Sequence, residues 1–332
     1  MTRLILTPHH PLLATGAVLA LVGTVVLSPQ SSVAGATEQL RKVTEELVHV
    51  RTGDGITNGG AVFGPADKSA RPIAVIWIHG STANFYQPTY IGIARELASR
   101  GFTAIVGNTR MHDLGNVAAF RGEQRIRGGA YWGVPSEQVY DLAAWIGFAQ
   151  GRGFTQVILA GHSAGAPAVQ RYQAEKQDER VAGLVLASGR VQPATTTPDP
   201  DMLAQATKLV ADGRGEELLR FPNRPSPSFT SAATFLDLAT AGPMQTDFFG
   251  VQTPSPPVTR IHCPILAWFG TREADIGTAA DLELLKSTLK RLSSGPARVD
   301  TTMIQNADHM YVGEEPQVAD TIAKWAETLV RR

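Results

Sequence analysis

Short runs of apolar residues alternate along the chain with segments of mixed polarity. Residues 73–78 are apolar at every position, and similar, mostly apolar runs cover residues 102–106, 155–160 and 181–187. A strand without a polar side is typical of a parallel sheet that helices cover on both faces. These runs therefore predict interior strands of an α/β fold.

The segments between the runs carry apolar residues at helical spacing, and the first of them ends at Gly101, a residue type common just after a helix. Further strands are expected at residues 265–269 and 299–304, and two short antiparallel strands, residues 47–51 and 61–63, open the fold. The predicted fold class is α/β, with a doubly wound, mostly parallel sheet. The apolar helix faces are Tyr90, Ile93, Ala94 and Leu97; Val139, Leu142, Ala143, Ile146 and Ala149; Leu282, Leu285, Leu289 and Leu292; Val318, Ile322, Trp325 and Leu329.

Between Ser188 and Arg260 the alternation of expected strands and helices stops, and proline-rich pieces surround helical segments at residues 202–211 and 232–239. We interpret residues 190–260 as a helical cap, inserted after the sixth strand over the end of the sheet where ligands bind in open α/β folds. The alternative is a surface excursion that covers only an edge of the sheet. Four large residues favour the cap, because each needs an apolar surface to face. They are Phe235, Leu236, Phe248 and Phe249.

The first 36 residues differ from the rest. Arg3 precedes an apolar stretch at residues 12–27, which is followed by small residues at Ser32, Ala34 and Ala36. This order is typical of a secretory signal peptide, and an uncleaved membrane anchor is the alternative. We therefore expect a secreted or periplasmic domain at residues 37–332, with membrane association only through the N-terminal segment.

Composition and charge exclude several classes of partner. Thirty basic residues balance thirty acidic ones without a basic block, so a nucleic-acid partner is not expected. The single cysteine, Cys263, forbids an intrachain disulfide and is expected to be a core thiol. The eight histidines are scattered, without a spacing typical of metal ligands. We expect neither a metal nor a cofactor, and a small molecule as the partner.

One motif carries the candidate chemistry. Ser163 lies in Gly161-His-Ser-Ala-Gly165, after an expected strand and before an expected helix at residues 166–176. That context is typical of a nucleophile elbow, a sharp turn that exposes the serine hydroxyl at the edge of a sheet. Side chains at either glycine would collide with the neighbouring strand or helix. The backbone N–H of Ala164, at the start of the helix, is expected to stabilise negative charge on an attacked carbonyl.

A serine nucleophile needs a base and an acid, which follow it along the chain in this type of fold. His309 comes after the last expected strand, where a loop could bring its imidazole over the elbow. The loop after residues 265–269 offers two acids: Glu273 lies where the acid usually falls, and Asp275 is the alternative. Asp308 is a poor candidate, because neighbours in a chain seldom face each other.

The second donor to a developing oxyanion is expected in the loop that follows residues 73–78. We choose the Ser81 backbone N–H, with that of Thr82 as the alternative. Gly80 allows the backbone to approach the substrate closely, and His79 is expected to pack and orient the loop rather than to transfer protons.

These features together resemble the α/β-hydrolase superfamily, from about residue 73 to the end of the chain. The resemblance lies in His79-Gly80, in the elbow motif, in Gly270-Thr-Arg-Glu273 and in Asp308-His309. The chain is also similar to uncharacterised single-domain serine hydrolases with an Arg-Gly-His-Asp-like turn after the fourth strand, although Met111 replaces that glycine. Some distant relatives of those proteins act on siderophore or other secondary-metabolite esters.

The resemblance implies carboxylester chemistry, and serine at the elbow argues against dehalogenase or epoxide hydrolase chemistry. The leading hypothesis is an exported serine hydrolase that cleaves carboxylic esters through an acyl-enzyme intermediate on Ser163, His309 and Glu273. Acyl transfer and thioester or amide hydrolysis on the same triad are alternatives. A ligand-binding protein without catalysis is the hypothesis from a different class.

Overall fold

The computed structural model describes residues 43–66, 71–189, 198–221 and 228–330. The expected signal peptide or anchor, residues 1–36, lies outside this part of the chain. Within the described residues, no helix has both the length and the apolar character needed to cross a membrane.

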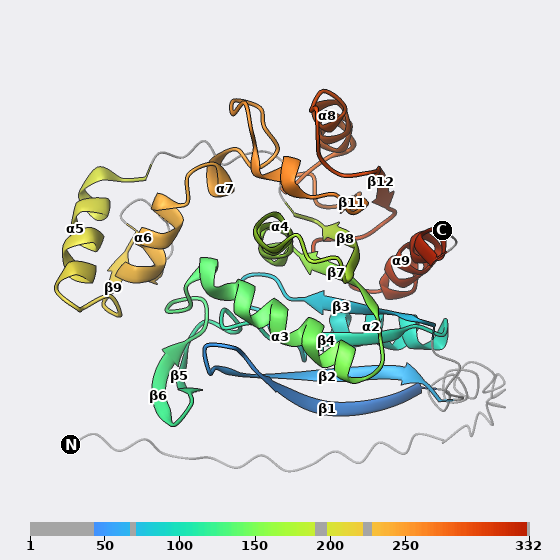
Figure 1. Cartoon of the computed structure of the whole chain (residues 1–332), viewed down its shortest axis with the longest axis horizontal. Coiled ribbons are helices and arrows are strands. Elements are labelled where there is room, and N and C mark those ends of the chain that lie inside the picture. Colours follow the sequence, from blue (N-terminus) through green and yellow to red (C-terminus); the bar gives the residue numbers. More distant parts are fainter. Residues whose placement is uncertain (1–42, 67–70, 190–197, 222–227, 331–332) are drawn as a thin grey trace, which may run out of the picture.

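An eight-stranded sheet forms the centre of the molecule, with strand order β1-β2-β4-β3-β7-β8-β11-β12 (Figure 1). The β1–β2 and β2–β4 pairs are antiparallel, and the pairs from β4 to β12 are parallel. The predicted α/β class with a mostly parallel sheet is therefore confirmed. The strands are β1 (Val43–Arg51), β2 (Thr57–Pro65), β3 (Ile73–Ile78), β4 (Thr103–Gly107), β7 (Gln156–His162), β8 (Val181–Ala187), β11 (Ile265–Gly270) and β12 (Val299–Ile304).

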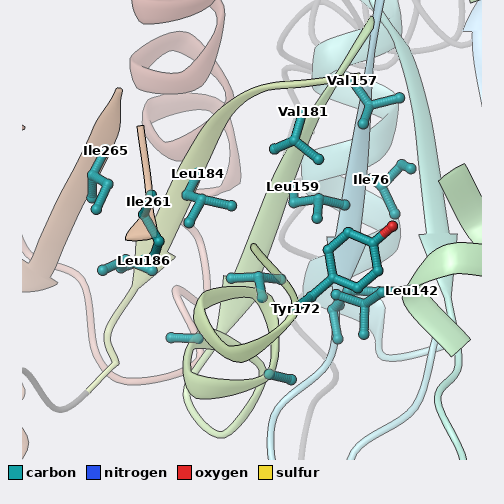
Figure 2. Close-up of a cluster of buried hydrophobic side chains, with 14 of the residues drawn as sticks. Ile76, Leu142, Val157, Leu159, Tyr172, Val181, Leu184, Leu186, Ile261 and Ile265 are labelled. Atoms are coloured by element: carbon teal, nitrogen blue, oxygen red, sulfur yellow. The ribbon is translucent and has the colours of Figure 1, made fainter. Parts of the chain in front are cut away.

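Helices cover both faces of the sheet, because successive residues of an interior strand point to opposite sides. On one face, Ala74, Ile76 and Ile78 of β3 belong to a buried cluster with residues of α3 (Gln138–Gly151) and α4 (Gly165–Lys176), which extends to α8 (Ala279–Lys290) beside β11 and β12. Figure 2 shows part of this cluster, with Leu142 and Tyr172 against the strands. The alternate residues of β3 pack with α2 (Pro88–Ser99) and α9 (Glu315–Val330). Cys263 is partly buried against the first of these clusters, and burial raises the pKa of its thiol to about 12.

The inserted segment has a small core of its own. It contains short strands and helices that Figure 1 shows in a group beside the sheet. Phe235 belongs to this small core and Leu236 packs against it, whereas Phe248 and Phe249 belong to the main core. The elements are α5 (Pro200–Ala211), β9 (Leu218–Arg220), β10 (Phe229–Ser231), α6 (Ala232–Thr240), α7 (Pro243–Thr246) and the 3-10 turn η2 (Pro257–Arg260).

A second hairpin was not expected from the sequence. Strands β5 (Asn116–Arg121) and β6 (Gln124–Gly128) pair with each other in a separate two-stranded sheet. Most residues of β6 are exposed, so the hairpin lacks the alternation of apolar and polar residues that marks a half-buried strand. The 3-10 turn η1 (Pro135–Glu137) then leads into α3.

Candidate active site

Ser163 lies in the tight turn between β7 and α4, with a left-handed backbone (φ 52°). Both flanking glycines are required by their neighbours. A Cβ on Gly161 would lie 2.2 Å from the carbonyl oxygen of Gly165, and one on Gly165 would lie 2.7 Å from the carbonyl oxygen of Ile78. Such separations are shorter than any packed contact, so strand and helix can approach only without these side chains. This is the geometry expected of a nucleophile elbow.

Three distant segments meet at this serine. The imidazole Nε2 of His309 is 3.0 Å from Ser163 Oγ, and its Nδ1 is 2.7 Å from Glu273 Oε2. Glu273 is 1% exposed, whereas Asp275 is exposed and has no hydrogen bond or ion pair within the described part of the chain. Since a carboxylate can only accept, Nδ1 carries the proton and Nε2 of the neutral ring is free to accept from the serine. The structure therefore brings Ser163, His309 and Glu273 together and leaves Asp275 apart.

The far oxygen of Glu273 is also engaged. Its Oε1 accepts hydrogen bonds from the Ser188 hydroxyl and from the Gly270 backbone N–H. Ser188 Oγ lies 2.5 Å from the Tyr311 hydroxyl, which in turn accepts from the Trp268 indole N–H at 3.1 Å. We refer to Trp268, Tyr311 and Ser188 as the network behind Glu273. Sequence reasoning missed it, because nothing in the order of these residues along the chain indicates that they meet.

His162, which precedes Ser163 in the chain, connects two loops to the serine turn. Its Nε2 lies 2.7 Å from the carbonyl oxygen of His309, so Nε2 must carry the proton. Its Nδ1 then accepts from the Tyr90 hydroxyl at 2.7 Å, and the Tyr90 oxygen accepts from the Gly80 N–H at 3.2 Å. Burial, reinforced by nearby His309, lowers the pKa of His162 to about 3. The ring is therefore a neutral connector at physiological pH.

The loop after β3 lies against the elbow. A Cβ on Gly80 would be 3.0 Å from the Ser163 Cβ, so the loop approaches the serine turn closely at this glycine. Thr82 has a left-handed backbone, φ 58°. The backbone N–H groups of Ser81, Thr82 and Ala164 have no acceptor among the residues that the structure describes. All three residues line one pocket, so these donors are available to a bound oxygen.

His79 holds the base of this loop. Its Nε2 accepts from the Thr109 backbone N–H at 3.1 Å, and its Nδ1 therefore donates to the Gly80 carbonyl oxygen at 2.8 Å. Burial lowers the pKa of His79 to about 4. The side chain lies away from Ser163 in this hydrogen-bond pattern, as expected for a residue that orients the loop.

Arg110 fixes the turn after β4. Its guanidinium contacts Asp141 at 2.9 Å, Asp54 at 3.0 Å and Glu137 at 2.5 Å, and its backbone N–H also donates to Asp141. Arg110 and Asp141 are both buried, and burial raises the pKa of the Asp141 carboxyl. Met111, which follows, lines the pocket described next.

A pocket of about 540 Å³ opens beside the serine turn. Its volume falls within the range of small-molecule sites. The sheet domain and the inserted segment both contribute to it, and backbone bonding between Ser231 N–H and the Tyr131 carbonyl oxygen (2.7 Å) joins the two parts. Its lining includes Ser81, Thr82 and Ala164, the apolar Met111, Leu114, Tyr131, Phe221, Phe229, Leu238 and Met244, and the polar Gln138, Thr230 and Arg171.

The site therefore lies in an α/β protein, at a sharp strand-to-helix turn that carries Ser163. Residues 75–321 match the model of the alpha/beta hydrolase family, and the chain belongs to that family. Among the described residues, no group of three or more His, Cys, Asp or Glu side chains is arranged to hold a metal.

Solved structures of the same fold include esterases. Est1E from Butyrivibrio proteoclasticus, with ferulic acid bound, is 14% identical over 86% of this chain and 100% of its own, with a TM-score of 0.59. A Pyrococcus furiosus esterase, Pf2001, is 15% identical over 88% of this chain and 93% of its own, with a TM-score of 0.53. A thermophilic esterase from Thermogutta terrifontis is 19% identical over 86% of this chain and 99% of its own, with a TM-score of 0.53. No curated protein sequence matches the chain.

Proposed function

We propose that the chain is an exported serine hydrolase that cleaves carboxylic esters through an acyl-enzyme intermediate. The observation that carries the proposal is the contact of His309 with Ser163 at 3.0 Å and with Glu273 at 2.7 Å. A serine hydroxyl is a weak nucleophile until a base accepts its proton, and this geometry supplies the base and its partner. Export is proposed from the N-terminal sequence alone.

The first half of the reaction forms an ester on the enzyme. Ser163 Oγ attacks the substrate carbonyl carbon while its proton moves to His309 Nε2, and the carboxylate of Glu273 stabilises the imidazolium. The N–H groups of Ser81 and Ala164 donate to the negative oxygen of the tetrahedral intermediate, with Thr82 as the alternative to Ser81. When the intermediate collapses, the imidazolium returns the proton to the leaving alkoxide. The alcohol departs and the acyl group stays on Ser163.

Water completes the cycle by the same steps. His309 Nε2 takes a proton from a water molecule, whose oxygen attacks the acyl carbon, and the second tetrahedral intermediate is stabilised by the same N–H groups. Its collapse returns the proton to Ser163 Oγ and releases the carboxylic acid. No other group is required to carry a proton in either half.

The pocket supports an uncharged ester with a bulky apolar group. Its lining is mostly aromatic and aliphatic, and its volume of about 540 Å³ is much larger than an acetyl group needs. Arg171 is the one charged side chain that lines it in the described part of the chain, and Glu175 (3.0 Å) and Asp237 (4.0 Å) already balance its charge. A substrate carboxylate or phosphate would compete with these two acids.

The direct test is Ser163→Ala, assayed with 4-nitrophenyl acyl esters, together with fluorophosphonate labelling of the unmodified protein. Turnover should fall on the order of 10⁴-fold or more, because the nucleophile is lost while binding remains. The probe should form an adduct on Ser163 and on no other residue. Full hydrolysis by pure Ser163→Ala protein would reject the proposal. Amino-terminal sequencing of the exported protein tests cleavage of the leader, since an intact Met1 on a membrane-bound product would reject cleavage.

A further inference from the structure

Glu273 is held from the side opposite His309. Its Oε1 receives the Ser188 hydroxyl and the Gly270 N–H, while Oε2 receives His309 Nδ1–H. The carboxyl group is buried, so these protein donors take the place of water. Donors of this kind fix the orientation of a carboxylate and compensate part of its charge.

Each proton in the network behind Glu273 has one possible position. A serine hydroxyl has one proton, and since Glu273 only accepts, the Ser188 proton points at the carboxylate. The Tyr311 hydroxyl must then donate to Ser188 Oγ, 2.5 Å away, and its oxygen accepts from Trp268 Nε1–H at 3.1 Å. Burial raises the pKa of Tyr311 well above its ordinary value, so this hydroxyl remains a donor. The donors thus point in one direction, from the core to the acid.

The backbone conformations at the network are unusual. Ser188 (φ 51°) and Tyr311 (φ 59°) are left-handed, like Ser163 (φ 52°). Non-glycine residues adopt this conformation only where the surroundings enforce it, and such residues cluster at functional sites. The Ser188 N–H donates to the Trp268 carbonyl oxygen at 3.0 Å, which anchors the strained residue to the next strand of the sheet.

We infer that Ser188 is a positioning residue of the proposed hydrolase, held by Tyr311 and Trp268. The inference rests on the proposed function. By donating to Oε1, Ser188 orients the carboxylate toward His309 and weakens the electrostatic attraction between the carboxylate and a protonated imidazole. His309 therefore holds a proton less firmly, and the site can activate Ser163 at lower pH than it could without the network.

Three buried ionisable side chains next to the site have pKa values shifted by burial. The ring of His162 lies 4.8 Å from that of His309, and burial lowers the pKa of His162 to about 3. His79 contacts the neighbouring loop, and burial lowers its pKa to about 4. Burial raises the pKa of Tyr90 to about 12. Between about pH 5 and pH 9 these groups keep one protonation state, so a shift of the acidic limb in a variant cannot be attributed to them.

The experiment measures the rate at which an alkyl fluorophosphonate labels Ser163, as a function of pH, so that it does not depend on a substrate. The variants are Ser188→Ala and Tyr311→Phe, each compared with the unmodified chain. The control is Tyr172→Phe, which removes another hydroxyl that donates to a carboxylate, that of Asp178 at 2.6 Å, outside the network. Circular dichroism and the melting temperature of each variant report whether it is folded.

The inference predicts that Ser188→Ala moves the acidic limb to higher pH by roughly 0.5 to 1 unit, because Glu273 loses a donor and the pair binds a proton more strongly. Labelling at the plateau should fall about tenfold as the carboxylate loses its fixed orientation. Tyr311→Phe should shift the limb in the same direction by less, and Tyr172→Phe should leave it unchanged.

An acidic limb that stays in place in folded Ser188→Ala or Tyr311→Phe protein overturns the inference, even if the plateau falls, because a purely structural role would lower activity without moving the limb. If Ser188→Ala fails to fold, Tyr311→Phe alone decides. A limb that shifts equally in Tyr172→Phe also counts against the network. Absence of labelling in the unmodified protein would instead reject the proposed function and, with it, this inference.

Discussion

The elbow depends on the absence of two side chains. The carbonyl oxygen of Gly165 lies 2.2 Å from where a Cβ on Gly161 would be, and that atom is backbone, which cannot rotate away. Relief would require moving the start of α4, and with it Ser163. Alanine at Gly161 can therefore be compared with alanine at a glycine whose surroundings leave room for a methyl group.

Gly161→Ala should lower the free energy of unfolding by about 2 to 4 kcal/mol, because the added methyl group forces the strand and helix apart. The matched control is Gly147→Ala on α3, where the added Cβ would meet nothing within 4 Å beyond its chain neighbours and the backbone of its own helix. That change should raise stability by up to about 1 kcal/mol, because alanine favours a helix. Urea unfolding of both variants checks the prediction, and similar stabilities would contradict it.

Glu273 and Asp275, the two acids of the loop after β11, differ in their contacts: Glu273 bonds to His309, whereas Asp275 is exposed. Glu273→Gln should lower kcat by about a thousandfold or more, because an amide can present an N–H to His309 Nδ1 and favour the wrong tautomer. Asp275→Asn should change kcat by less than about threefold, since Asp275 is exposed. The assay is hydrolysis of a 4-nitrophenyl ester at saturation. A large loss in Asp275→Asn with activity kept in Glu273→Gln would reverse the assignment.

Position along the chain predicted which three side chains meet at the site, because each follows the end of an expected strand. Ser163 follows β7, Glu273 follows β11 and His309 follows β12, and the ends of parallel strands meet at one edge of a sheet. Ser188 also follows a strand, β8, but a lone serine at a strand end carries no signal. Its role depends on a contact with Tyr311, 123 residues away, which only the folded chain reveals.

At the scale of elements, burial on both faces decided what the sequence could predict. The boundaries of β3 and β8 agree with the expected ranges, because continuous apolar runs end where the strands reach solvent. The bounds of β12 also agree, although this strand is only partly buried and mixes polar with apolar residues. The strand β1 extends to Val43, beyond the expected residues 47–51, and is largely exposed; Leu47, for example, is 80% exposed. Most residues of β6 are exposed as well. Backbone pairing rather than side-chain burial defines these strands, and the spacing of apolar residues along the sequence does not reveal such pairing.

The strand β10 supplies the pocket with an aromatic wall that can be tested. Phe229 lies at its start, with its ring 6.3 Å from that of Tyr131, and both line the pocket. Phe229→Ala should lower kcat/KM for 4-nitrophenyl phenylacetate by about tenfold or more, because an apolar contact with the acyl group is lost. Hydrolysis of 4-nitrophenyl acetate should change by less than about threefold.

The control for this prediction is Phe120→Ala on β5. Phe120 lines a separate cavity of about 380 Å³ and is 43% exposed. Both esters should be hydrolysed as in the unmodified protein. Equal losses for both esters in Phe229→Ala would indicate that the strand supports the fold rather than the acyl group.

At the scale of the whole molecule, the hydrogen bonds that organise the site also affect how stability depends on pH. His79 and His162 are buried and neutral in the folded chain, with pKa values lowered by burial to about 4 and about 3. In the unfolded chain each titrates near its ordinary pKa of about 6.5. The unfolded state therefore binds more protons between these limits, and stability falls as the pH is lowered through this window.

Each of the two histidines should contribute up to about 1.4 kcal/mol of lost stability per pH unit below about pH 6. The measurement is the free energy of unfolding in urea between about pH 6.5 and pH 5, where ordinary carboxylates keep their charge. His162→Gln keeps a donor and an acceptor but cannot be protonated, so its slope should be shallower by one proton. His49→Gln, on the exposed edge of β1, should leave the slope nearly unchanged. An equal slope in His162→Gln and the unmodified chain would mean that His162 is charged in the folded protein over this range. Its Nδ1–H would then donate to the Tyr90 oxygen, while Nε2–H would still donate to the His309 carbonyl oxygen.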